Sequence, residues 1–337
     1  MLSCGSGSTK SEDPKTLFLT SIANLGKGFL DVFTSLSDMV AGAFGIKADT
    51  KKSDIGKYFI SIETTMNTVK KNLQEEVTKN GNYVKIKSVV DTFITGTLDK
   101  IAEGAKTAAS GATGDDKIGG ATAGQDAAPA EVASVNALVK GIKIIVDIVL
   151  ENNEGNPVAT KTGDTEKKSI GKLFSGKKDT DGTEVQAAAA SASIGAVTGS
   201  VTGADILQAI AKAASTEADK DIDKASNAAE IAAAKADANG KDFGDGQKDA
   251  VIAAGIALRA MAKNGKFAAK TGEDKSAHAV NGVAASAVGK TLSTLIIAIR
   301  NTVDSGLKTI SETLATVTQE DKSAEATTPA ETTASGQ

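Results

Sequence analysis

Two long apolar stripes with helical spacing, one near each end of the chain, constrain the fold more than any other feature of the sequence. The first runs from Phe18 to Ala43, and its apolar residues recur alternately three and four positions apart. The second runs in a similar way from Val288 to Val317. This spacing places the apolar side chains on one face of a helix, and neither helix can bury that face alone. The sequence therefore predicts that the two end helices pack together and that the chain termini lie side by side.

Several stretches between these helices also carry helical patterns. They are 55–77, 83–101, 132–149, 184–196, 204–238 and 247–263. The segments 104–128, 155–183 and 239–246 are predicted to be exposed loops, apart from a short apolar insert near Phe174. The predicted fold class is all-α, an elongated helical bundle with its N- and C-terminal long helices packed together and long loops at its distal end.

Small side chains supply much of the apolar content. Only 3% of the 337 residues are aromatic, and 34 are Gly. Because an Ala side chain buries little area, stability must come from close contact between helices. The longest apolar run, from Ile142 to Leu150, is interrupted by Lys143 and Asp147. It is far shorter than the roughly 20 residues needed to cross a bilayer, so no membrane-spanning segment is expected.

The scarcity of Cys and His limits the chemistry that the chain can perform. It has one Cys and one His, whereas a structural zinc needs four ligands and a thiol or hydroxyl nucleophile needs a base beside it. The formal net charge of −4 and the scattered lysines provide no basic stripe for a phosphate backbone. We predict that the protein is not an enzyme, that it uses no cofactor or metal, and that nucleic acid is not a partner.

Two short motifs resemble nucleotide-binding patterns but fail in their context. The segment 171–177 matches the phosphate-loop pattern G-x-x-x-x-G-K, yet Lys178 follows where Ser or Thr should hold magnesium. The segment 242–244 spells the Asp-Phe-Gly tripeptide of kinases, but the chain's only His, His278, lies downstream of it. Both segments are predicted to be ordinary surface loops.

The remaining polar candidates are predicted to be structural. His278 should lie ahead of the last helix as a surface or half-buried residue. The segment 179–182 is similar to a calcium loop but lacks the further ligands at the required spacing. Paired carboxylates such as Asp115 and Asp116 have no apolar pocket that would raise one pKa, so solvated charge is the predicted state.

The first residues resemble the end of a bacterial lipobox. In the run Leu2-Ser3-Cys4-Gly5, an aliphatic residue stands two places before Cys4 and a small residue stands just before it. Lipid on Cys4 would be followed by a flexible tether of Gly and Ser residues with a reach of roughly 17 Å. A free Cys in a disordered start is the alternative. The charged and apolar regions of a signal peptide do not precede Cys4, so we expect a mis-assigned start or an incomplete gene copy.

Three segments resemble the variable large proteins of Borrelia. The N-terminal helix of that family is similar to NLGKGFLDVFTSLSDMVAGAFG, from Asn24 to Gly45, and the resemblance continues in KKSDIGKYF, from Lys51 to Phe59. The invariable segment of the family, and of the related variable surface lipoprotein of Lyme-disease spirochaetes, is similar to IALRAMAKNGKFAAK, from Ile256 to Lys270. We predict that Ile256–Lys270 is core, with charged groups such as that of Arg259 kept in water.

The resemblance implies an outer-membrane surface lipoprotein that is expressed one variant at a time, so that switching evades host antibody. It brings no catalytic residues, and only the lipid-bearing position carries over, onto Cys4. We divide the chain into a lipobox remnant and tether at 1–15, a helical surface-antigen domain at 16–318 and a disordered tail at 319–337. The alternative is an adhesin or host-protein binding module on the same scaffold, which would need an exposed apolar or basic patch.

Overall fold

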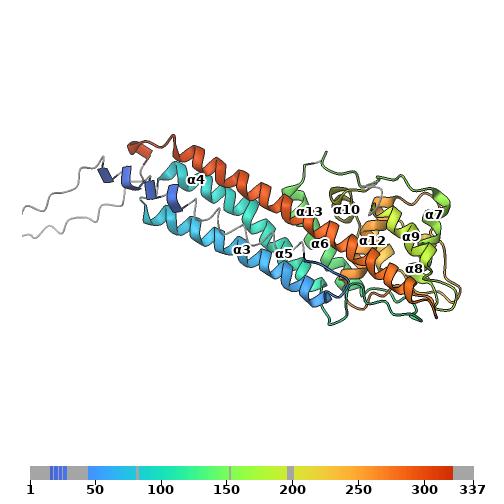
Figure 1. The fold of residues 1–337 in the computed structure, drawn as a ribbon. Coiled ribbons are helices and arrows are strands. Elements are labelled where there is room, and N and C mark those ends of the chain that lie inside the picture. The colour runs from blue at the N-terminus through green and yellow to red at the C-terminus, as the bar shows by residue number, and fades with distance from the viewer. Residues whose placement is uncertain are drawn as a thin grey trace, which may run out of the picture.

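The computed structural model describes residues 45–80, 83–151, 153–195 and 201–321, and the short helical pieces 16–17, 19–21, 23–24 and 26–28. Within these ranges the fold is all-α, as predicted, and the only strand-like pairings are isolated bridges. The molecule is elongated, with a narrow stem and a broad lobe (Figure 1).

Long helices form the stem. They are α3 (Lys52–Lys79), α4 (Val84–Phe93), α5 (Asp99–Gly111), α6 (Val132–Val149) and α13 (Asp274–Leu314), with the π-helix η1 (Ile94–Leu98) joining α4 to α5. The apolar stripes predicted for α3 and α13 face the core, where Phe59, Leu73, Leu295 and Ile299 are fully buried. Long helices form because each one presents a continuous apolar face to its neighbours.

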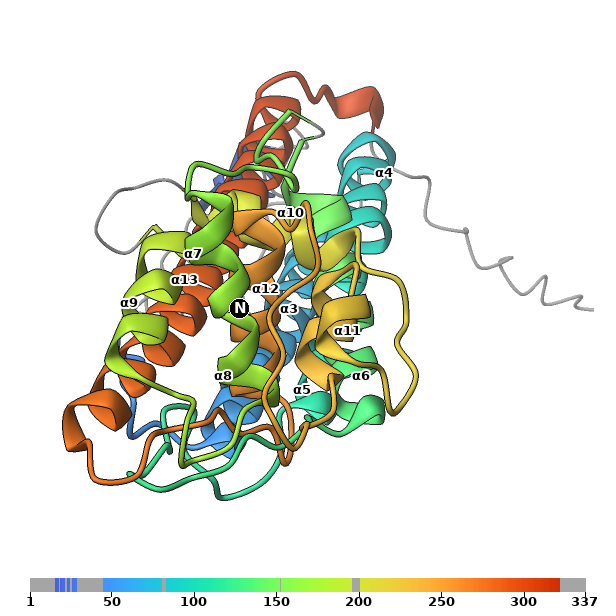
Figure 2. The ribbon, with the colours of Figure 1, turned by 90° about the vertical axis from the view of Figure 1, so that its right-hand side faces the viewer.

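Short helices form the broad lobe around the first half of α13. They are α7 (Asp164–Ser169), α8 (Gly171–Ser175), α9 (Glu184–Ser193), α10 (Gly203–Ala211), the 3-10 turn η2 (Ile222–Lys224), α11 (Ala228–Ala233) and α12 (Asp249–Met261). Helix α12 lies at the centre of this lobe (Figure 2) and contacts α9, α10, α11 and α13. Every residue from Ile252 to Ala262 is buried, so α12 is the core helix of the lobe.

Glycines allow direct backbone contact between α5 and α6. A Cβ on Gly141 would lie 2.3 Å from the backbone N of Ala108 and 2.5 Å from the carbonyl O of Gly104. A Cβ on Gly104 would meet Gly141 O at 2.7 Å. The two backbones therefore touch, as the small-residue composition predicts.

The described pieces nearest the two termini lie together at the narrow end (Figure 1). A Cβ on Gly26 would lie 3.7 Å from Cδ2 of Leu314. This agrees with the prediction that the termini lie side by side. Most of the first predicted helix, from Phe18 to Ala43, lies outside the described residues. After α13 the described chain ends in a 3-10 turn, η3 (Gln319–Asp321).

Three predicted boundaries were wrong. Residues 104–111 belong to α5 rather than to a loop, because their Gly and Ala residues fit against α6. The segment 204–238 is not one helix but contains α10, η2 and α11, because Ser, Thr, Asp and Asn side chains cap and interrupt the chain despite its high Ala content. Helix α13 begins at Asp274, well before Val288, because small buried residues extend its apolar face toward the lobe.

The predicted loop 155–183 also contains core residues. It includes α7 and α8, and the side chains of Leu173 and Phe174 are buried. Phe174 packs edge-on against Phe267, with ring centroids 5.4 Å apart. Its aromatic ring explains this burial, since few large apolar side chains are available to fill the lobe.

By length and hydropathy, α13 could also cross a membrane. The sequence prediction missed this because it considered uninterrupted apolar runs only. In the structure, 56% of the relevant window is buried inside the protein, and a core helix passes the same test.

Candidate functional site

The lipidation residue predicted from the sequence, Cys4, lies outside the described residues. Its modification stays a prediction. The described pieces that lead toward it end at the narrow end of the molecule, opposite the broad lobe (Figure 1).

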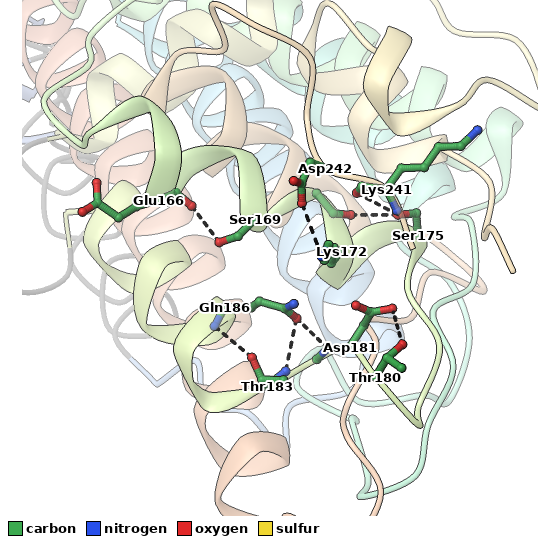
Figure 3. Close-up of polar contacts among 12 residues, drawn as sticks. Glu166, Ser169, Lys172, Ser175, Thr180, Asp181, Thr183, Gln186, Lys241 and Asp242 are labelled. Carbon is green, nitrogen blue, oxygen red and sulfur yellow. Dashed lines mark hydrogen bonds and ion pairs between the residues drawn. The ribbon is translucent and has the colours of Figure 1, made fainter. Parts of the chain in front are cut away.

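The segment 171–177 is a buried helical turn and not a phosphate loop. A Cβ on Gly171 would lie 2.5 Å from the backbone N of Phe243, so no phosphate has room there. Lys172 lies 3.8 Å from Asp242 at the rim (Figure 3). The match to the motif was accidental, but its predicted exposure was wrong because Phe174 fills the core.

Asp181, in the segment 179–182 that is similar to a calcium loop, stabilises the local backbone conformation. Asp181 accepts hydrogen bonds from the backbone N of Lys177 at 3.1 Å and from the Thr180 hydroxyl at 3.0 Å (Figure 3). Within the described part of the chain, no three His, Cys, Asp or Glu side chains are grouped as metal ligands would be. His278 lies inside α13 rather than ahead of it, with its Nδ1 2.7 Å from the carbonyl O of Asp274.

Three basic side chains, of which Arg259 and Lys52 are buried and Lys290 is half-buried, form a feature that the sequence did not predict. Arg259 is fully buried and donates to the carbonyls of Ala232 at 2.8 Å, Phe174 at 2.6 Å and Ala234 at 2.5 Å. Its guanidinium carbon lies 4.8 Å from the centre of the Phe174 ring. Burial lowers the pKa of Arg259 to about 9, which leaves the group charged at neutral pH.

The prediction that Arg259 keeps its charge in water was therefore wrong. The physical reason is that α12 is buried on every side, which leaves no route to solvent from position 259. The available signal was the sequence of α12 itself, which is apolar all around rather than on one face. The predicted burial of the apolar residues in Ile256–Lys270 is confirmed, since Ile256, Leu258 and Met261 are fully buried. Lys263 and Lys266 are exposed, as predicted for the charged residues of the segment.

Lys52, in the first turn of α3, is the second buried cation. Its Nζ donates to the carbonyls of Arg259 at 3.3 Å, Ala262 at 2.5 Å and Gly265 at 2.8 Å. These groups lie at and just beyond the C-terminal end of α12, where helix carbonyls have no partner within the helix and a cation is favoured. Burial lowers the pKa of Lys52 to about 7, although the nearby charge of Asp116 opposes this shift.

Lys290 of α13 donates hydrogen bonds to carbonyls just beyond the C-terminal end of α9. Its Nζ donates to the carbonyls of Ile194 at 3.0 Å, Gly195 at 3.3 Å and Val201 at 2.6 Å. Burial lowers its pKa, against the effect of Asp205. Arg259 donates in the same way to carbonyls at the ends of α8 and α11. Arg259, Lys52 and Lys290 therefore satisfy carbonyl groups at helix C-termini that have no partner within the helix.

Because of Lys52, we expect the free energy of unfolding to rise with pH between about 7 and 10. The unfolded chain keeps the Lys52 proton up to the ordinary lysine pKa of 10.5, whereas the folded chain loses it above about 7. In this window the unfolded state binds more protons, so raising the pH favours folding by up to about 1.4 kcal/mol per pH unit. Urea unfolding at several pH values measures the slope. The variant Lys52→Met should lack this contribution, and an equal slope in both proteins would contradict the assignment.

One buried carboxylate holds a loop of the lobe. Asp249 accepts from the backbone N of Lys161 at 2.6 Å and of Thr162 at 2.8 Å, and from the Ser193 hydroxyl at 2.8 Å. Burial acts to raise its pKa, but these donors outweigh burial, so the pKa lies below the ordinary value. The group is thus an ionised structural acid.

A groove of about 720 Å³ lies between α7 and α9 at the outer side of the lobe. Its lining includes Val185, Ala188, Ala189 and Glu166, and Val185 is 76% exposed. It is an exposed apolar surface of the kind that the binding-module alternative requires. The loops of the broad lobe lie at the end of the molecule opposite the described pieces nearest the termini (Figures 1 and 2).

Comparison with known proteins gives consistent matches along the chain. The model of the Borrelia lipoprotein family matches residues 29–314. Variable large protein 4 and variable large protein 17 of Borrelia hermsii are 64% and 61% identical over 339 residues, which cover all of this chain and 96% and 95% of those proteins. The crystal structure of the Lyme disease variable surface antigen VlsE of Borrelia burgdorferi is similar, with a TM-score of 0.76 and 36% identity. The match covers 88% of this chain and 98% of that one.

Proposed function

This chain belongs to the Borrelia lipoprotein family, among its variable large proteins, and we propose that it is an outer-surface antigen varied to evade host antibody. Acyl chains on Cys4 would hold it to the outer membrane. The observation that carries the proposal is the shape of the molecule. The described pieces nearest the termini lie at the narrow end, and the loop-rich lobe lies at the other (Figure 1).

This arrangement suits an antigen anchored at its N-terminus. A lipid at Cys4 would place the narrow end near the membrane and the loops of the broad lobe farthest from it. Loops with few core contacts tolerate surface substitutions at a cost typically within about 0.5 kcal/mol. Host antibody would therefore meet the part of the protein that can change most easily.

We also propose a non-enzymatic role. The support is that the buried ionisable side chains of the described residues, which are the groups most similar to catalytic residues, already have structural partners. Asp249 holds main-chain N–H groups, and Arg259 and Lys52 hold main-chain carbonyls. A group that is fully occupied in holding the fold is poorly placed to exchange protons with a substrate.

Lipid attachment at Cys4 is the first test of the proposal. In cells that express the chain behind a complete signal peptide, we expect a radioactive fatty acid to label the protein, because Cys4 becomes the acylated N-terminus. The variant Cys4→Ala should carry no label and should be released from the membrane. Label retained in Cys4→Ala would contradict the anchor.

Surface display is tested on the same cells. Protease added outside intact cells should cut the lobe loops, whereas a periplasmic control protein stays whole. If the loops survive under conditions that cut the purified protein, the chain is not displayed and the proposed function is wrong.

A further inference from the structure

Two asparagines on long helices hold loops through the main chain alone. Asn136 of α6 accepts from the backbone N of Thr216 at 2.9 Å and donates to the carbonyl O of Thr216 at 3.1 Å. Asn281 of α13 makes the same two hydrogen bonds with Ala121: it accepts from the backbone N at 2.8 Å and donates to the carbonyl O at 2.9 Å. In each pair one side-chain amide satisfies both polar backbone groups of one loop residue.

Charged side chains on the core helices do the same for other loops. Arg259 donates to the carbonyls of three residues in and after α11, and Lys290 donates to the carbonyls that follow α9. Asp249 accepts from two successive N–H groups in the loop before α7. The five residues Asn136, Asp249, Arg259, Asn281 and Lys290 are called the loop-holding residues below.

Main-chain groups are the same whatever side chain a loop residue carries, except that Pro has no N–H. A hydrogen bond to the backbone therefore fixes the path of a loop whatever side chains the loop residues carry. The loop 212–221 illustrates this, since most of its side chains are exposed and its buried residue, Thr216, is the one that pairs with Asn136. The exposed side chains next to Thr216, from Ala214 to Ala218, form none of the ion pairs that Lys220 and Asp221 make at the end of this loop with Glu230, Lys235 and Lys241.

Apolar side chains fix the lobe at a few further points. Ile222 and Phe243 are buried and anchor the segments around them. Asp219 has a backbone φ of 65°, which restricts the residues accepted at that position. Between such points the loops are kept in place by main-chain pairing and by ion pairs such as Lys220–Glu230 and Lys168–Asp245.

We propose that the loop-holding residues form a sequence-independent clamp, which lets exposed loop residues of the broad lobe be replaced without loss of the loop conformation. The inference rests on the proposed function for its biological meaning. It explains physically how a surface can change while its scaffold stays the same. Variation would be confined to side chains that no core helix contacts.

The loop 212–221 provides the test, because Lys212 and Lys220 flank the residue held by Asn136 and report on the loop as trypsin sites. The loop variant changes four exposed residues and leaves Thr216 and Asp219 in place: Ala214→Gln, Ser215→Asn, Glu217→Thr and Ala218→Gln. The clamp variant is Asn136→Ala in the otherwise unchanged full chain. Native-state trypsin cleavage is followed by mass spectrometry, with the exposed Lys308 of α13 as an internal reference.

We expect the loop variant to be cleaved within about twofold of the parent rate, and Asn136→Ala at least about tenfold faster, because two hydrogen bonds that close the loop are lost. Asn136→Asp keeps the acceptor for the Thr216 N–H but not the donor for its carbonyl, so its rate should lie between the two. If Asn136→Ala shows no thermal transition, Asn136→Asp replaces it, and the criterion is then a cleavage rate above that of the loop variant.

Two outcomes would overturn the clamp. One is equal acceleration in the loop variant and in Asn136→Ala, and the other is an unchanged rate in Asn136→Ala. The measurement uses purified protein without cells or antibody. A failure of surface display would leave this result unchanged, and a failure of the clamp would leave the display experiments unchanged.

Discussion

Replacing Arg259 with methionine should remove about 4 kcal/mol or more of the free energy of unfolding. Methionine fills the space of the Arg259 stem but leaves the carbonyls of Phe174 and Ala234 buried without a donor. The Ala232 carbonyl loses one of its two donors and keeps the bond from the Ala130 N at 3.2 Å. Each unsatisfied group costs about 1 to 3 kcal/mol, and the loss of the contact with the Phe174 ring adds to this. The substitution also removes the free-energy cost of burying the Arg259 charge, but this gain offsets only part of the loss. It leaves no acidic side chain unpaired. Urea unfolding followed by circular dichroism measures the difference.

The chain contains a matched control in Arg300. This arginine lies on the exposed face of α13, with its side chain 46% exposed and 3.5 Å from Asp304. The same change, Arg300→Met, should alter stability by less than about 0.5 kcal/mol. Equal effects of the two substitutions would mean that Arg259 does not hold the lobe together.

The variant Gly141→Ala should destabilise the protein by about 1 to 2 kcal/mol. The new Cβ would lie 2.3 Å from Ala108 N and 2.5 Å from Gly104 O, and both of these atoms belong to the backbone of α5. Neither atom can move aside without separating α5 from α6 or distorting a helix, and such overpacking typically costs about 1 to 3 kcal/mol. The gain in helix propensity from Gly to Ala recovers at most about 1 kcal/mol.

The opposite sign is expected at Gly289 of α13. A Cβ there would meet no atom within 4 Å, so Gly289→Ala should stabilise the protein by about 0.5 to 1 kcal/mol through helix propensity. Thermal melts of both variants compare the two positions directly. Stabilisation by Gly141→Ala would show that α5 and α6 are not in backbone contact.

Long, one-sided apolar patterns predicted the stem well. The stripes of α3, α6 and α13 correspond to buried residues such as Leu73, Ile142 and Ile299. These helices could be predicted because one repeating face decides both their secondary structure and their burial. The lipidation site remains a prediction because Cys4 lies outside the described residues.

The broad lobe was harder to predict because its structure depends on contacts between residues far apart in sequence. Alanine favours helix throughout 204–238, yet polar residues such as Asn227, which caps α11, divide that stretch into α10, η2 and α11. The roles of Arg259 and Lys52 depend on carbonyls that only the folded chain brings to them. No local pattern marks a side chain whose partners are distant backbone groups.

The pairing of Lys52 with the end of α12 has a consequence for the timing of folding during synthesis. Its three carbonyl partners follow it by 207, 210 and 213 residues. At about 5 to 20 residues per second, a ribosome needs roughly 10 to 40 s to supply them after Lys52 has been made. Until then Lys52 lacks the partners that would bury it, so the contact between α3 and the end of α12 cannot form early. On the proposed surface location, this delay would help to keep the nascent chain competent for export through a secretion channel.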